Sequence, residues 1–189
     1  MLVDALYQSG ARGAATLAAY QWAQRRPNSQ AAQESLFQLA LEGEYALLAA
    51  GAAERLADLG ALAERIRVDP AALAEVLRQP DGSQATLADM ERFELGKLHL
   101  EARDYAGTVR ELEGVAVTAA RNNRALALFH LGRGEEALSA ALDAWQQDPG
   151  NLFALGWALQ LRLYRGDEGG ARGLAVPLAQ AQARRAEDA

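Results

Sequence analysis

The chain has 189 residues, 50% of them apolar, and carries a formal charge of −6 at pH 7. This acidic balance argues against a nucleic-acid surface, which needs a basic stripe to contact phosphates. The lack of cysteine excludes disulfides and thiolate metal sites. The N-terminal residues lack the basic and apolar regions of a signal peptide, and no uncharged apolar run reaches the roughly 20 residues of a membrane helix. We therefore expect a soluble cytoplasmic protein.

Alanine leads the apolar half of the composition, and aromatic residues make up only 6% of the chain. Alanine is the best helix former, and no alternating run rich in Val, Ile and Thr indicates a strand. An all-α protein is therefore predicted.

Glycine and proline divide the chain into short helices. Gly10, Pro27 and Gly60 each stop a helix, and Asn28 or Ser29 can cap the helix that follows Pro27. In chain order, helices are expected over residues 4–9, 11–26, 30–42, 46–59, 70–78, 85–101, 105–113, 119–131, a stretch ending before Pro149, and 152–165, followed by a last segment from Glu168.

Three places interrupt this regularity. Residues 61–84 do not share the pattern of their neighbours; Asp69-Pro70 favours a helix start and 80–82 a turn, so we expect one or two inserted helices and a bend here. Gly114 is expected in a left-handed conformation, with Thr118 capping the next helix. Pro177 should break the last segment, leaving a final helix over 177–185.

A repeat runs through the helices. The stretch 121–151 contains a helix, a glycine turn, a second helix and a proline stop. A shift of 34 residues places Gly132 on Gly166 and Ala137 on Ala171. The same internal offsets, five and then twelve residues, separate Gly10, Ala15 and Pro27 near the N-terminus and Gly132, Ala137 and Pro149 here.

This pattern resembles the tetratricopeptide repeat (TPR) family, whose units pair helices around small residues and close on a proline. The pairs Leu95-Gly96 and Asp104-Tyr105 also match the family. The resemblance implies a single domain over 1–189, a right-handed α-solenoid of stacked antiparallel helix pairs with atypical helices in the middle and at the C-terminus. Its units would span about 4–28, 29–60, 85–117, 118–150 and 151–187, with a non-repeat insert at 61–84.

Two features depart from the family. Arg121 and Arg124 stand where it normally has apolar residues. The first unit also lacks the start of its first helix, which leaves open an atypical end repeat or a piece excised from a longer protein.

The resemblance implies a concave groove lined by the first helices of the units, which is the family's usual binding surface. Carried onto this chain, the inward positions are Gln33, Phe37, Met90, Phe93, Lys97, Asn122, Leu126, Phe129, Phe153 and Gln160. Lys97 is the only lysine, which argues against the carboxylate clamp found in some members. The apolar lining fits an apolar or amphipathic helical ligand better. The alternative is that the phenylalanines are core or inter-repeat packing.

No catalytic or cofactor motif emerges. His99 and His130 lack carboxylates at metal-ligand spacing, and we interpret them as ordinary groove or surface histidines. Paired acids such as Glu135-Glu136 are interpreted as capping and solvation. The glycine-rich 166–173 lacks the lysine of a P-loop and follows a helix, so no cofactor or metal is expected.

Three functions remain open at this point. The first is a protein–protein interaction scaffold that binds a peptide or amphipathic helix in the groove, without direct contact to nucleic acid or membrane. The second is a regulatory or sensor TPR domain of a larger bacterial protein, such as a transcriptional regulator. An enzyme is a distant third. Self-association through the end repeats is a further option for the partner.

Overall fold

In the computed structural model, residues 2–56 and 85–187 are described, and these stretches contain helices and no strand. The helices are α1 (Leu2–Gln8), α2 (Arg12–Arg25), α3 (Gln30–Glu42), α4 (Ala46–Ala53), α7 (Leu87–Glu101), α8 (Tyr105–Glu111), α9 (Thr118–His130), α10 (Gly134–Gln147), α11 (Leu152–Tyr164) and α12 (Glu168–Glu187). The expected all-α class is confirmed over these residues. The helix expected over 70–78 and the insert at 61–84 lie outside the described residues.

The helices form pairs, and the turn inside each pair contains one left-handed residue. These turn residues are Gly10, Glu44, Arg103, Gly132 and Gly166, with φ of 80°, 59°, 59°, 73° and 74°. Their spacing is 34, 59, 29 and 34 residues (44 − 10, 103 − 44, 132 − 103 and 166 − 132). The turns therefore give the register of the repeat directly.

A small side chain follows five residues after each turn residue, at the point where the two helices of a pair approach most closely. These residues are Ala15, Ala49, Thr108, Ala137 and Ala171, and none is more than 3% exposed. A larger side chain would push the paired helices apart. The alanine-rich composition is thus used at the helix crossings.

Two main cores fill the stack. The N-terminal core combines residues from α1 to α4 with Leu98 of α7, and the C-terminal core combines residues from α9 to α12. A smaller cluster built around Leu112, Val115 and Val117 lies beside α7 and α9. Each helix therefore packs against its chain neighbours, as expected for a stack of pairs.

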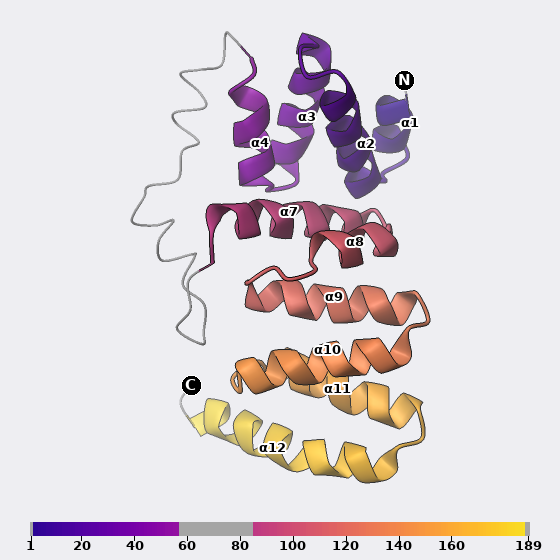
Figure 1. The fold of residues 1–189 in the computed structure, drawn as a ribbon, viewed down its shortest axis with the longest axis vertical. Coiled ribbons are helices and arrows are strands. Elements are labelled where there is room, and N and C mark those ends of the chain that lie inside the picture. Colours follow the sequence, from indigo (N-terminus) through magenta and orange to yellow (C-terminus); the bar gives the residue numbers. More distant parts are fainter. Residues whose placement is uncertain (1, 57–84, 188–189) are drawn as a thin grey trace.

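The first two pairs meet the rest of the stack at α7, which packs against both α2 and α4. Helix direction changes there: α1–α4 run along the long axis in Figure 1, whereas α7–α12 run across it. A Cβ added to Gly13 would lie 2.8 Å from Cβ of Glu101, so α2 and α7 touch closely. The Glu94 carboxylate accepts hydrogen bonds from the N–H groups of Leu47 (3.1 and 3.0 Å) and Leu48 (3.1 Å), which caps the start of α4 from α7.

Several helix starts have a local side-chain cap. The Ser29 side chain accepts from the Ala32 N–H at the start of α3, Thr86 and Asp89 form a capping box on α7, and Asn151 caps α11. Ser29 is one of the two caps expected from the sequence. Gly114 is left-handed as predicted, with φ of 70°.

Several expected boundaries differ from the structure. Helix α4 ends at Ala53 instead of reaching residue 59, and α8 ends at Glu111 instead of 113. Helix α9 starts at Thr118, so Val117 takes the cap position and makes no side-chain cap. Helix α12 continues through Pro177 without a break; Leu174 before the proline and Leu178 after it both pack on the C-terminal core, and this holds the two halves in one helix.

Candidate binding surface

Two of the ten residues expected in the groove lie inside the stack. Gln33 is 2% exposed and its Nε2 donates to the Pro27 carbonyl at 3.0 Å, and Phe37 is 8% exposed within the N-terminal core. The turn residue Glu44 explains their placement. Asn122 stands ten residues before Gly132, the turn residue of its own pair. The matching residue of the second pair, ten before Glu44, is Glu34, which is exposed, whereas Gln33 lies one position earlier and is buried.

The expected groove residues of α7 are partly covered. Met90 and Phe93 are half-buried and pack on the small cluster of Leu112 and Val115. Lys97 is more open: its Nζ lies 5.1 Å from the centre of the Tyr45 ring and 3.8 Å from a Glu101 oxygen. A cation over a ring with a carboxylate beside it is held in place, so Lys97 links α7 to the start of α4.

Asn122 of α9 is engaged with the next pair. Its side-chain amide donates to Asn151 Oδ1 at 3.3 Å and accepts from Asn151 Nδ2 at 3.0 Å. Because Asn151 also caps α11, this amide pair fixes how α9 meets α11. Leu126, one turn further along α9, is half-buried.

The richest side-chain cluster is aromatic and surrounds Phe129. The Phe129 ring lies edge-on to Trp157 at 5.3 Å and to Tyr164 at 5.6 Å between centroids, and His130 stacks on Tyr105 at 4.4 Å. We call these five residues the aromatic patch. Such edge-on and stacked pairs are each stabilising by about 0.5–1.5 kcal/mol beyond their buried area, so the rings of the patch hold one another in place.

The patch is open on one side. Tyr164 is 79% exposed, His130 is exposed, and the neighbouring Leu163 is 52% exposed. A cleft of 350 Å³ adjoins it, lined by Phe129, Gly132, Gly134, Glu135, Leu161, Tyr164 and Arg165. Arg165 and Glu135 form an ion pair at this cleft, with 2.7 Å between Nη1 and Oε2. One wall of the cleft is therefore aromatic. The other wall carries the Arg165–Glu135 ion pair, whose two charges cancel.

Of the sequence-predicted groove residues, only Phe129 belongs to the patch. Phe153 is 57% exposed and Gln160 is exposed, but Phe153 lies eleven residues before Tyr164 on α11, about 16 Å at 1.5 Å per residue. Sequence reasoning missed Tyr164, although this residue stands one 34-residue repeat after His130. The same shift takes Phe129 to Leu163.

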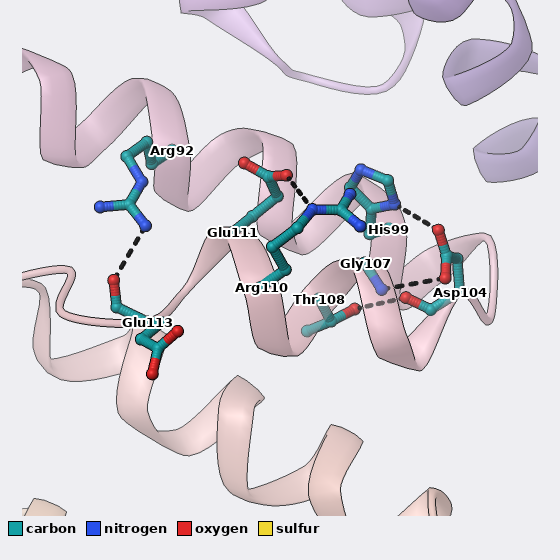
Figure 2. Close-up of polar contacts among 8 residues, drawn as sticks. All are labelled: Arg92, His99, Asp104, Gly107, Thr108, Arg110, Glu111 and Glu113. Atoms are coloured by element: carbon teal, nitrogen blue, oxygen red, sulfur yellow. Dashed lines mark hydrogen bonds and ion pairs between the residues drawn. The ribbon is translucent and has the colours of Figure 1, made fainter.

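The polar network around His99 is a helix cap (Figure 2). His99 Nδ1 lies 2.8 Å from Asp104 Oδ2, and Asp104 Oδ1 accepts from the Gly107 N–H at 3.0 Å. Burial alone would raise the pKa of Asp104, but the Gly107 N–H and His99 lower it below its usual value. His99 is 5% exposed, so its interpretation as a groove or surface histidine is wrong: it is a core residue that holds the cap of α8.

Within the described residues, no three His, Asp or Glu side chains are grouped in a way that could hold a metal ion. The same residues include no helix both long and apolar enough to cross a membrane.

Stacked helix pairs with a common turn and a small residue at each crossing define a helical-repeat protein. No protein-family model matches the chain, and no curated protein is similar to it in sequence. Among solved structures, the fold is similar to MamA, with a TM-score of 0.53 and 12% identity over 99% of this chain and 98% of MamA. It is also similar to YrrB, described as a TPR protein with an unusual peptide-binding site, with a TM-score of 0.50 and 16% identity over 95% of this chain and 82% of YrrB. The chain therefore has a TPR-like helical-repeat fold, as the sequence resemblance implies.

Proposed function

We propose that this protein is a non-enzymatic interaction scaffold that binds a peptide or amphipathic helix, and that the first helices of its pairs provide the binding surface. The aromatic patch with Leu163 carries this proposal. Binding energy in such interfaces concentrates in a few aromatic anchors, and rings already packed in place lose little freedom on binding. YrrB, with the same fold, is described as binding peptide, which supports the general role.

The anchors on this chain are expected to lie on α9 and α11. Tyr164 and Leu163 are already exposed, and Phe129 packs edge-on against the Tyr164 ring. Phe153 extends the apolar surface to the other end of α11, as an amphipathic helix lying along it would require. Among the other predicted groove residues, Lys97 and Gln160 reach solvent and can orient polar groups of the ligand. The cytoplasmic location and bacterial source expected from the sequence remain predictions.

The test starts from partner capture. Wild-type protein, a Tyr164→Ala variant and a Val176→Ala variant are immobilised, and the proteins retained from the source lysate are compared by mass spectrometry. The segment of the retained partner is then titrated calorimetrically. We expect Tyr164→Ala and Phe153→Ala each to weaken binding by more than about 1 kcal/mol, because both remove an exposed anchor.

Val176→Ala is the matched apolar control, because Val176 is 59% exposed on α12. This variant should bind the partner with the affinity of wild type. Phe129→Ala is informative only if it still melts cooperatively, since a packed phenylalanine can cost about 3–5 kcal/mol of folding free energy. Equal affinity of wild type, Tyr164→Ala and Phe153→Ala for a partner that binds would exclude this surface.

A further inference from the structure

A second cleft lies between the loop after α8 and helix α10, away from the aromatic patch. It has a volume of 230 Å³. Its lining includes Leu112, Val115, Ala140, Arg121, Arg124 and Asp143. The binding function proposed above makes no use of this cleft.

The cleft exists because the third pair is short. Only 29 residues separate the turn residues Arg103 and Gly132, compared with 34 between Gly132 and Gly166. Helix α8 has 7 residues, whereas α10 has 14, and the chain leaves α8 through the left-handed Gly114. The helical turns that would cover the start of α9 are therefore replaced by the loop 112–117.

Arginines occupy core positions at this junction. The residues 34 positions after Arg121 and Arg124 are Leu155 and Ala158, which are 1% and 0% exposed in the C-terminal core. In α9 the same two positions hold half-buried arginines that line the cleft. They lie three residues apart, on one helix face. Asn122 and Leu126 lie on a different face of α9, because neighbouring residues are separated by about 100°.

In the part of the chain that the structure describes, the two guanidinium groups have no carboxylate bonded directly to them, although Asp143 lines the same cleft and the charge of Glu136 interacts with that of Arg124. Within the described residues, neither Arg121 nor Arg124 makes an ion pair or a hydrogen bond, and the Nε of Arg124 is buried without a partner. Other arginines near these helices are paired: Arg110 with Glu111, Arg133 with Glu136 and Arg165 with Glu135. The buried Nε–H of Arg124 lacks an acceptor, which costs stability, and an oxyanion in the cleft would remove that cost.

The walls of the cleft limit which oxyanion fits. An arginine fork matches a carboxylate or a phosphate. Asp143 adds a negative charge to the same cleft, which disfavours a doubly charged phosphate more than a singly charged carboxylate. Leu112, Val115 and Ala140 offer an apolar wall, which favours a ligand with a short hydrocarbon group.

We propose that this cleft binds a small carboxylic acid, with its carboxylate on Arg121 and Arg124 and its short apolar group against Leu112 and Val115. The acid could be free or could be the C-terminus of a peptide that ends in an apolar residue. Both present the same chemistry, and the experiment separates them.

The probes are 3-methylbutanoate and its neutral amide, and N-acetyl-Gly-Leu with either a free or an amidated C-terminus. Binding to the full chain is followed by the amide NMR signals of 114–116 and the Nε–H signal of Arg124. We expect at least one of the two acids to give saturable shifts there, and both amides to give none. The tighter of the two acids identifies the source.

Variants locate the site. Arg121→Gln and Arg124→Gln should each weaken acid binding at least tenfold, whereas Arg172→Gln, on the exposed side of α12, should leave it unchanged. Asp143→Asn should tighten binding, because a like charge is removed. Arg124→Lys keeps the alkyl packing and the charge but loses the fork, so weakened binding in a cooperatively melting Arg124→Lys protein supports the proposal even if the glutamine variant does not fold.

Three results would overturn the proposal. These are the absence of saturable shifts with both acids, affinity for the acids unchanged in both glutamine variants, or weaker binding of the acids to Asp143→Asn, which would contradict repulsion between Asp143 and a carboxylate bound in this cleft. None of them bears on the aromatic patch, so the two proposals fail separately.

Discussion

Two of the five turn residues are not glycine. Glu44 and Arg103 both have φ of 59°, although side chains with a Cβ rarely adopt the left-handed region. Their strain is local and of order 1 kcal/mol each. The turns persist because the helices on both sides are packed, and this packing determines the backbone between them.

Replacing either residue with glycine should therefore stabilise the protein. We expect Glu44→Gly and Arg103→Gly each to raise the free energy of unfolding by up to about 1 kcal/mol, the gain from relieved strain being partly offset by the greater freedom of glycine in the unfolded chain. Urea unfolding followed by circular dichroism measures the change.

The matched control is Glu91→Gly on α7. Glu91 is exposed and helical, so glycine there should cost about 1 kcal/mol. A loss of stability in both turn variants equal to the loss in Glu91→Gly would show that the left-handed conformation carries no strain.

At the scale of the helices, packing can outweigh local signals. Proline inside a helix costs about 3 kcal/mol, yet α12 runs from Glu168 to Glu187 through Pro177. Burying a leucine side chain contributes about 1.5–3 kcal/mol. Leu174 and Leu178, one on each side of Pro177, pack on the C-terminal core and together offset the cost of the proline.

The helix crossings are where a single substitution should matter most. Ala137 is 0% exposed between the helices α9 and α10. Ala137→Leu should overpack this crossing and lower the free energy of unfolding by about 1–3 kcal/mol. Ala179→Leu on the exposed side of α12 should change it little. Thermal melts compare the two, and equal midpoints would contradict the register given by the turn residues.

At the scale of the whole molecule, helix starts make stability depend on pH. The Thr86 hydroxyl and N–H lower the pKa of Asp89, and the Gly170 N–H and Arg162 lower that of Asp167. The pKa of Asp104 is also lowered, as described above. A carboxyl group with a depressed folded-state pKa stabilises the fold above its unfolded pKa, about 3.9 for Asp, and this contribution is lost as the pH falls through the folded value.

Glu94 acts in the opposite direction. Burial raises the pKa of the Glu94 carboxyl group, and the opposing effect of the Leu47 and Leu48 N–H groups is smaller. The ionised form of Glu94 therefore destabilises the fold, and this destabilisation disappears as the pH falls through the raised pKa. We therefore expect the thermal midpoint to change little from pH 7 to 5 and to fall below about pH 4, because the unfolded chain then binds protons at these three aspartates and the folded chain does not.

Asp104→Asn tests the origin of this fall. Asparagine still caps a helix but does not titrate, so this variant should lose less stability than wild type between pH 5 and 3. An acid response identical to wild type would show that the His99–Asp104–Gly107 contacts do not contribute to it.

The sequence by itself determined the class of fold and the punctuation of the chain. Glycine, proline and cap residues act within a few positions, so α3 is predicted at 30–42 without error and α11 differs by one residue. The 34-residue shift from Gly132 to Gly166 likewise needs no tertiary information, because both turns contain glycine.

Only the tertiary structure decided the register of the second pair and which residues form the aromatic patch. The glycine in the turn of the second pair, Gly43, has φ of −90°, and the left-handed residue is Glu44, one position later. Gln33 stands ten residues before Gly43, as Asn122 does before Gly132, and this one-residue difference explains why Gln33 and Phe37 are predicted in the groove although they are buried. The continuity of α12 and the clustering of Trp157 and Tyr164 around Phe129 depend on the neighbouring pair. Burial and strain are set by what packs across from a residue, and in a stack of helices those neighbours lie about 30 residues away along the chain.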